Sequence, residues 1–317
     1  MAYAVRQFLL RAEFFLCVSF LTLVILASLS LQGQYGQPTA TADNQNQRES
    51  PVWYNVTAAD SIRNLTTSCL KKCEYLVRYS FNNLTNFPTE EECARRTPIG
   101  HYYTCAIVGN GGILRDSGCG REIDHNEFVI RINDSPFKTF EQDVGQKVNL
   151  TVVNSVSLRR IQTTDNGTRK LNYSQWLLSR NNSILSYLLP RHEMLKIWNA
   201  EIKKLDLNIT TTYSMHRTTH QVTRLWNDTL KASKGLPTAG LCTFSLATTF
   251  CDVITLYGFY PFKHDVHNRT LRYNYYSKKS VKHNINKSKV HNFFRENNLF
   301  KSLYNLGAIM MVTDFCT

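Results

Sequence analysis

Residues 103–126 read YTCAIVGNGGILRDSGCGREIDHN and predict a buried strand, a glycine-rich turn and a short helix. The strand covers Tyr103–Val108, the turn begins at Gly109, and the helix is expected between Gly118 and Asn126. Such a turn lets backbone amides approach a phosphate and presents a helix N-terminus to it. A dinucleotide fingerprint would need a glycine where Leu114 stands, and the lysine of a P-loop is absent. The turn therefore permits a phosphate or nucleotide site, and a tight turn without a ligand is the alternative.

Outward from this turn, predicted strands alternate with predicted helices. Strands are expected at Phe128–Ile132, Val148–Val153, Val253–Tyr257 and Ala308–Val312, and helices at Leu241–Phe250 and Val290–Tyr304. Residues 175–235 favour helix and are basic. This alternation predicts an α/β fold with a Rossmann-like, mostly parallel sheet flanked by helices.

The composition limits the class of protein. The chain has 317 residues, 37 Lys and Arg against 24 Asp and Glu, and a formal charge of +13. Four Trp, 16 Tyr and 17 Phe supply enough apolar bulk for a core, which excludes global disorder. The charge favours an anionic partner: nucleic acid, acidic lipid, or a phosphorylated or sialylated substrate. The nine cysteines contain no C-x-x-C pair, so a zinc module is not expected.

The N-terminus carries an apolar segment long enough to cross a thin bilayer. Phe14–Leu31 is free of charged residues, and a helix of that length spans about 27 Å. Arg6 and Arg11 precede it, so the positive-inside rule predicts a cytoplasmic tail over residues 1–13. We expect a type II signal anchor at 14–31, a polar stem at 32–70 and a lumenal domain at 71–317. A cleaved signal peptide is the alternative, although no clear A-x-A site follows.

The density of glycosylation sequons also indicates the lumen. N-x-S/T tripeptides occur at Asn55, Asn64, Asn83, Asn133, Asn149, Asn166, Asn172, Asn181, Asn208, Asn227, Asn268 and Asn286. Each alone is weak, but together with eight cysteines beyond the apolar segment they favour an oxidising secretory compartment. Nucleic acid is therefore not an expected partner.

Two long strings carry a family resemblance. CAIVGNGGILRDSGCGREIDHNEFVIRINDSPFKTFEQDVGQKVNLTVVN, at Cys105–Asn154, closely resembles the large sialylmotif of animal sialyltransferases, and PTAGLCTFSLATTFCDVITLYGFYPF, at Pro237–Phe262, resembles the small one. His291–Glu296 is similar to the His-x4-Glu very small motif, and Tyr275-Tyr276 stands where the third motif falls. The resemblance covers residues 105–296 in the family's order. It implies a variant of the GT-A-like fold and a Golgi membrane location.

The resemblance is sharpest to the α2,8-sialyltransferase branch, through SGCG at Ser117–Gly120 and the near-terminal Cys316. Pairing in that branch implies the disulfides Cys105–Cys251 and Cys119–Cys316. Cys69, Cys73, Cys93 and Cys242 are left, and four cysteines allow three pairings among which the sequence does not choose.

The family's chemistry implies a mechanism. The donor would be CMP-sialic acid, with no metal and no further cofactor, and the acceptor a sialylated glycolipid or glycoprotein. His291 matches the general base, a role that suits imidazole because it exchanges protons near neutral pH. Glu296 is expected to be a structural partner of the motif rather than a second base. A histidine on the surface of an amphipathic helix is the alternative for His291.

The remaining site residues are carried over from the two large motifs. The donor-binding positions are Asn110, Asn133, Asn154, Ser155, Thr238, Ala239, Gly240 and Tyr260. If Asn133 lines the donor pocket, its sequon cannot carry a glycan. For each of these residues a turn or a helix cap is the alternative.

Three positions depart from the family pattern. Asn274 stands where the third motif commonly has a phosphate-stabilising histidine, Ala239 where a threonine is expected, and Tyr260 where this branch usually has tryptophan. His264 or His267 are candidates to compensate for the missing histidine. These changes leave two further hypotheses: a sialyltransferase acting on galactose or N-acetylgalactosamine, and a catalytically weak binder of glycan or nucleotide sugar.

The basic stretch from Arg191 to Lys234 has two interpretations. It could grip an anionic, sialylated acceptor, or it could be a solvated helical face, which is the commoner role for such charge.

Overall fold

The computed structural model describes residues 54–80, 89–162, 173–190, 193–226, 235–281 and 290–316. The expected tail, anchor and residues 32–53 of the stem lie outside these ranges. Within them, no helix is both long and apolar enough to cross a membrane.

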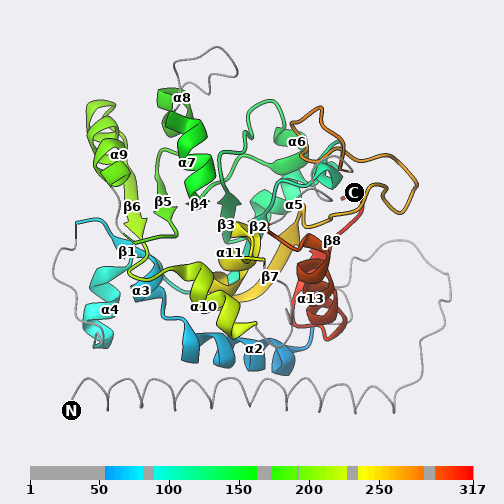
Figure 1. Cartoon of the computed structure of the whole chain (residues 1–317), viewed down its shortest axis with the longest axis horizontal. Helices are drawn as coiled ribbons and strands as arrows, with labels where there is room; N and C mark the ends of the chain where they lie inside the picture. The colour runs from blue at the N-terminus through cyan, green and yellow to red at the C-terminus, as the bar shows by residue number, and fades with distance from the viewer. Residues whose placement is uncertain are drawn as a thin grey trace.

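A single sheet forms the centre of the described molecule (Figure 1). Its strands are β1 (Val77–Arg78), β2 (Tyr102–Val108), β3 (Phe128–Ile132), β4 (Leu150–Val153), β5 (Ser183–Tyr187), β6 (Ile209–Tyr213), β7 (Cys251–Tyr257) and β8 (Met310–Val312). Their order is β1-β6-β5-β4-β3-β2-β7-β8, and only the pairing of β1 with β6 is antiparallel among them. The predicted α/β fold with a mostly parallel sheet is confirmed.

Helices cover both faces of the sheet, as the buried strands require. They are α2 (Val56–Cys69), α3 (Lys72–Tyr75), α4 (Glu90–Arg96), the 3-10 turn η2 (Gly112–Leu114), α5 (Gly120–His125), α6 (Glu141–Val144), α7 (Ser155–Gln162), α8 (Tyr173–Leu178), α9 (Glu193–Lys204), α10 (Thr218–Leu225), α11 (Ala239–Ala247) and α13 (Phe293–Asn305).

The alternation of side chains along the strands assigns each helix to a face. Ile107 and Ile130 are register partners and pack in one core cluster with α2, α10, α11 and α13. Ala106 and Val129, one residue earlier on the same strands, pack against α5 and α6 on the opposite face. Leu185 of β5 continues that second face and packs against α7, α8 and α9.

The sequence prediction that 175–235 favours helix was only partly right: α9 and α10 lie there, but two strands were missed. That stretch contains β5 and β6, which pair in parallel inside the sheet. Both are only five residues long, SILSY and ITTTY, and are rich in β-branched and hydroxyl side chains. The long amphipathic helices around them, α9 and α10, supply the stronger periodic signal, so the short strands were masked by their neighbours.

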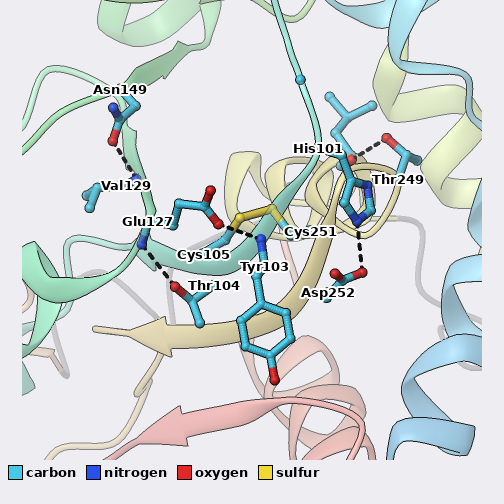
Figure 2. The surroundings of a disulfide bond; sticks show 12 residues. His101, Tyr103, Thr104, Cys105, Glu127, Val129, Asn149, Thr249, Cys251 and Asp252 are labelled. Carbon is cyan, nitrogen blue, oxygen red and sulfur yellow. Dashed lines mark hydrogen bonds and ion pairs between the residues drawn. A yellow bond between two sulfur atoms is a disulfide. The ribbon is translucent and has the colours of Figure 1, made fainter.

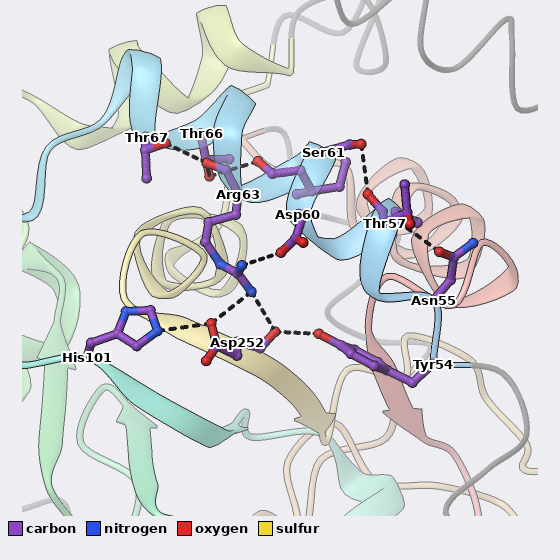
Figure 3. A network of polar contacts seen from close by, with 12 residues as sticks. Tyr54, Asn55, Thr57, Asp60, Ser61, Arg63, Thr66, Thr67, His101 and Asp252 are labelled. Carbon is purple, nitrogen blue, oxygen red and sulfur yellow. Dashed lines mark hydrogen bonds and ion pairs between the residues drawn. The ribbon is translucent and has the colours of Figure 1, made fainter.

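The segment just after residue 53 belongs to the folded body rather than to a free stem. Ala59 and Ile62 of α2 are buried, although the predicted stem extended to residue 70. Figure 3 shows how the segment is attached to the start of β7: the Tyr54 hydroxyl donates to the Asp252 carbonyl at 2.6 Å, and Arg63 Nη2 lies 3.0 Å from Asp252 Oδ1. His101 approaches the same carboxylate from the other side, at 2.9 Å.

Three disulfides stabilise the described structure. Cys105–Cys251, which Figure 2 shows between β2 and β7, and Cys119–Cys316 are the two that the resemblance implied, and both are confirmed. Cys73–Cys93 joins α3 to α4 and settles one pairing that the sequence left open. Cys242 is a buried thiol in α11.

Candidate active site

A cavity of about 330 Å³ opens at the carboxyl ends of β2, β3, β4 and β7. β3 flanks β2 on one side and β7 flanks it on the other, so the chain order reverses at β2. In an open parallel sheet, ligands bind at such a reversal, because the loops after the two central strands turn away from each other. The loops Gly109–Gly111 after β2 and Gly258–Pro261 after β7 both line the cavity.

The glycine turn after β2 lies so close to neighbouring backbone that side chains do not fit. A Cβ atom added at Gly111 would lie 2.4 Å from the Gly258 carbonyl oxygen, and one at Gly112 would lie 1.9 Å from that of Arg272. Gly111 N donates to the Gly258 carbonyl at 3.1 Å. A bridge from Gly111 to Asn274 attaches the third-motif segment to the same turn. These contacts fix the relative positions of three cavity walls.

Three asparagines define the wall formed by β2, β3 and β4. Asn110 Nδ2 donates to the Ile132 carbonyl at 3.3 Å, while its buried Oδ1 has no hydrogen-bond partner in the described structure. Asn133 has a φ of 64°, a left-handed conformation that asparagine tolerates. Asn154 accepts from the amides of Val156 and Ser157 at 3.1 and 2.9 Å and so caps α7. Among these three asparagines, Asn110 is therefore the one whose side-chain oxygen still lacks a donor in the described structure.

The opposite wall is the N-terminus of α11. Thr238 caps this helix by accepting from the Leu241 amide at 3.1 Å. Gly240 permits close packing, because a Cβ there would lie 2.8 Å from the Phe259 ring. The helix therefore presents its partial positive charge to the cavity.

Glu296 connects that wall to α13. One carboxylate oxygen accepts from Thr238 N at 2.8 Å and the other from Thr238 Oγ1 at 2.5 Å. Burial raises the pKa of Glu296 to about 7, and the two bonds from Thr238 oppose that rise. As expected from the sequence, Glu296 has a structural role: it holds the α11 N-terminus against the segment that carries His291.

His291 lies just before α13 rather than on it, because Asn292 caps the helix by accepting from the Arg295 amide at 3.1 Å. Its Nδ1 is 2.7 Å from the Leu236 carbonyl oxygen, and Leu236 N donates to the Val290 carbonyl at 2.7 Å. A carbonyl oxygen only accepts, so Nδ1 carries the hydrogen. In the neutral ring the lone pair is then on Nε2, which is the arrangement that a general base needs.

The chain matches the family model of glycosyltransferase family 29 (sialyltransferase) over residues 48–308. The protein belongs to this family. It is 27% identical over 251 residues to an alpha-N-acetylneuraminide alpha-2,8-sialyltransferase of Bos taurus, a match that covers 77% of this chain and 67% of the bovine one.

Two solved structures of mammalian sialyltransferases are also similar to it. One, in complex with Gal-beta-1-3GalNAc-ortho-nitrophenol, is 20% identical with a TM-score of 0.45, and the match covers 67% of this chain and 70% of that one. The other is 18% identical with a TM-score of 0.47, covering 84% and 82% respectively.

The structure of this sialyltransferase brings almost all predicted site residues to one cavity. Asn110, Asn133, Asn154, Thr238, Ala239, Gly240, Tyr260 and His291 all line it. Ser155, the first residue of α7, does not line the cavity, although Val156 and Ser157, the next two residues of the helix, do. The position of Asn133 in the wall agrees with the expectation that its sequon carries no glycan.

Sequence reasoning missed several residues that line the cavity. Asp134, Phe259, Tyr273, Phe293, Asn297 and Phe300 belong to this group. Four of them, Asp134, Phe259, Tyr273 and Asn297, are sequence neighbours of a motif residue. That adjacency was the signal by which the sequence could have indicated them. Neither His264 nor His267 lines the cavity, and His267 instead lies 2.8 Å from Asp314 near the C-terminus.

The described part of the basic stretch of this sialyltransferase does not form one surface. Lys196 and Lys204 lie on α9, where each contacts a glutamate of the same helix. Arg217 directly precedes α10 and Arg224 lies on it, on the other face of the sheet. Among the described residues of 191–234, this arrangement fits solvated helical faces better than one acceptor-binding patch. No group of three or more His, Cys, Asp or Glu side chains within the described ranges could hold a metal ion.

The close approach at the glycine turn yields a first prediction. Gly112→Ala should lower the free energy of unfolding by about 1–3 kcal/mol, because the new methyl group overlaps the Arg272 carbonyl. Gly100→Ala is the matched control, since its nearest atom would be 3.5 Å away. Thermal unfolding of the two variants measures the difference, and equal midpoints would contradict the packing argument.

A second prediction concerns pH. The folded-state pKa of Glu296, about 7, exceeds the ordinary glutamate pKa of 4.5, so the protonated carboxyl stabilises the fold below about pH 4.5. That contribution, about 3 kcal/mol, is lost as pH rises through 7. Glu296→Gln should therefore flatten the dependence of unfolding free energy on pH between about pH 5 and 8.

Denaturant titrations across that range provide the measurement. Glu193→Gln, at a side chain that is 76% exposed on α9, is the control and should follow the unaltered protein. A Glu296→Gln profile parallel to that of the unaltered protein would show that this carboxyl does not titrate there.

Proposed function

We propose that this sialyltransferase transfers sialic acid from CMP-sialic acid to the 8-hydroxyl of a terminal sialic acid on a glycolipid or glycoprotein glycan. The observation that carries the proposal is that both large motif segments and His291 line one cavity. The α2,8 linkage is supported by the bovine relative and by the SGCG string, whose cysteine pairs with the near-terminal Cys316.

In the proposed reaction His291 is the general base. Its Nδ1–H is held by the Leu236 carbonyl, so Nε2 of the neutral ring takes the proton from the acceptor 8-hydroxyl. That oxygen bonds to the anomeric carbon of sialic acid while the bond from that carbon to the phosphate oxygen breaks. CMP leaves with the bonding electrons, and the configuration at the anomeric carbon inverts. The reaction as proposed uses no metal ion and no further cofactor.

The two cavity walls have separate roles in this proposal. The α11 N-terminus with Thr238, Ala239 and Gly240 suits the donor carboxylate, because a helix N-terminus favours an anion. Asn110 and Asn133 offer amide groups to the nucleotide and sugar. The unpartnered Oδ1 of Asn110 can accept a hydrogen bond from a hydroxyl group of CMP-sialic acid. Tyr260 and Asn274 replace the usual tryptophan and histidine, and are expected to affect rate and acceptor preference.

We further propose that the protein is a single-pass type II protein of the Golgi membrane with its catalytic domain in the lumen. The charge-free segment Phe14–Leu31 and the sequons support this location. The disulfides support it too, because they persist in oxidising compartments.

Transfer assays on the full chain test the linkage. The chain is purified in detergent and supplied with labelled CMP-sialic acid and with matched acceptors that either carry or lack terminal sialic acid. Transfer confined to sialylated acceptors, into a product that an α2,8-specific sialidase cleaves, is the expected result. Transfer to exposed galactose or N-acetylgalactosamine would overturn the linkage, and CMP binding without any transfer would indicate a glycan or nucleotide-sugar binder.

His291→Ala tests the mechanism. The variant should lose about 10²- to 10⁴-fold in kcat, the usual contribution of general base catalysis, while its affinity for CMP stays within about twofold. Calorimetry with CMP and initial-rate measurements separate the two quantities. His220→Ala, at a histidine on α10 that does not line the cavity, is the control, and a His291→Ala variant with full kcat would refute the proposed base.

A further inference from the structure

The charged side chains that line the cavity of this enzyme are acidic, which is unexpected for an anionic donor. The inference rests on the proposed donor, CMP-sialic acid. CMP-sialic acid carries a phosphate and a carboxylate, yet the described lining residues include no Lys or Arg. They do include two acids, Asp134 and Glu296. A cation close behind this wall would offset the charge of these acids and so favour an anionic ligand.

Two buried arginines lie directly behind the loop that follows β3. Arg131 is on β3 and Arg180 follows α8, and both are 1% exposed. The guanidinium carbons lie 4.8 and 5.4 Å from the centre of the Phe137 ring, respectively. Phe137 ends the loop whose first residues, Asn133 and Asp134, line the cavity. The two cations therefore sit on the other side of the cavity wall.

Hydrogen bonds fix both guanidinium groups to backbone. Arg180 Nη2 donates to the Ser135 carbonyl at 3.0 Å, and Arg131 Nε donates to the Lys147 carbonyl at 3.0 Å. Arg180 Nη1 donates to the Trp176 carbonyl at 3.1 Å, and its guanidinium lies 4.2 Å from the Trp176 ring centre. Arg131 Nη2 and Arg180 Nε have no hydrogen-bond partner in the described structure. These hydrogen-bond acceptors are neutral carbonyls, so they hold the two guanidinium groups in place without cancelling their positive charge.

Few carboxylates are available to this pair. Arg131 Nη2 is 3.9 Å from Asp124 Oδ1, but that side chain is 33% exposed and already accepts from the Gln146 and Lys147 amides. Asp134 is the carboxylate that interacts electrostatically with Arg180. Burial lowers the pKa of Arg180 to about 9, with a further lowering by Arg131, and burial lowers that of Arg131 to about 10. Both groups are still charged at neutral pH.

We propose that Arg131 and Arg180 are positioning residues that make the donor cavity accept an anion, by balancing Asp134 and by holding the loop Asn133–Phe137 in place. Neither touches the ligand. With one guanidinium removed, the charge of Asp134 in the wall is no longer balanced, and an anionic nucleotide is disfavoured relative to a neutral nucleoside.

The test compares the affinities of the full chain for CMP and for cytidine, which differ in the phosphate. Arg180→Met should weaken CMP binding on the order of tenfold while cytidine binding changes by less than about twofold. Adding Asp134→Asn to Arg180→Met should restore the CMP-to-cytidine ratio, because it removes the unbalanced negative charge. Isothermal titration of the unaltered chain, the single variant and the double variant with each ligand gives the binding constants.

Arg96→Met is the matched control, since Arg96 is equally buried, at 2% exposure, but lies in α4 and lines no part of the cavity. Equal losses for CMP and cytidine in Arg180→Met would mean that the arginine only shapes the loop, and would overturn the electrostatic role. An unchanged ratio, or a double variant that is not restored, would overturn it as well.

Two measurements keep the inference falsifiable if Arg180→Met fails to fold. Arg180→Lys retains the charge and should keep most of the preference for CMP over cytidine. A loss of CMP affinity as large as that expected for Arg180→Met would contradict the electrostatic role. In the unaltered protein, the CMP-to-cytidine ratio should change little between about 0.05 and 0.5 M salt, because buried charges are poorly screened. A steep fall would assign the preference to exposed cations. If the unaltered chain binds no CMP at all, the proposed donor itself fails.

Discussion

The pairing of β2 with β7 is the constraint on which the rest of the active site depends. These strands are far apart in sequence, run parallel in register from Tyr102 and Cys251, and are joined by a disulfide. At their carboxyl ends the glycine turn packs against Gly258 with no space for a side chain. Because no side chain separates the two loops, their backbones form one continuous floor, and the asparagines and aromatic residues that follow can face a common cavity.

The catalytic half of the site is attached to this floor by a buried carboxyl group. Glu296 binds both the amide and the hydroxyl of Thr238, so α13 and the N-terminus of α11 are fixed in position relative to each other. His291 belongs to the same segment and is oriented by the Leu236 carbonyl. The proposed base and the proposed carboxylate site are thus positioned by the same few contacts, which explains why His and Glu occur five residues apart in one motif.

The sequence predicted the parts of the fold that have strong local signals. β2, the turn after it, β3 and β7 were recognised because mostly apolar, β-branched or aromatic runs end at glycine or asparagine. β5 and β6 were missed, since a five-residue strand next to a long amphipathic helix has little periodicity of its own. The packing of α2 on the sheet was also missed, because the side chains that hold it, Tyr54 and Arg63, bind a residue almost 200 positions away.

By itself, the sequence determined the family, the α/β class, two disulfides and eight residues of the cavity, because a motif keeps residue types at fixed spacing. Only the tertiary structure decided that Ser155 does not line the cavity and that Cys73 pairs with Cys93. Only the folded chain, too, brings Arg180 behind the loop of Asn133 and Asp134, through a bond to Ser135 that spans 45 positions. The physical reason is the same in each case. Burial and electrostatic contact depend on the distance between residues in space, which cannot be read from their separation along the chain.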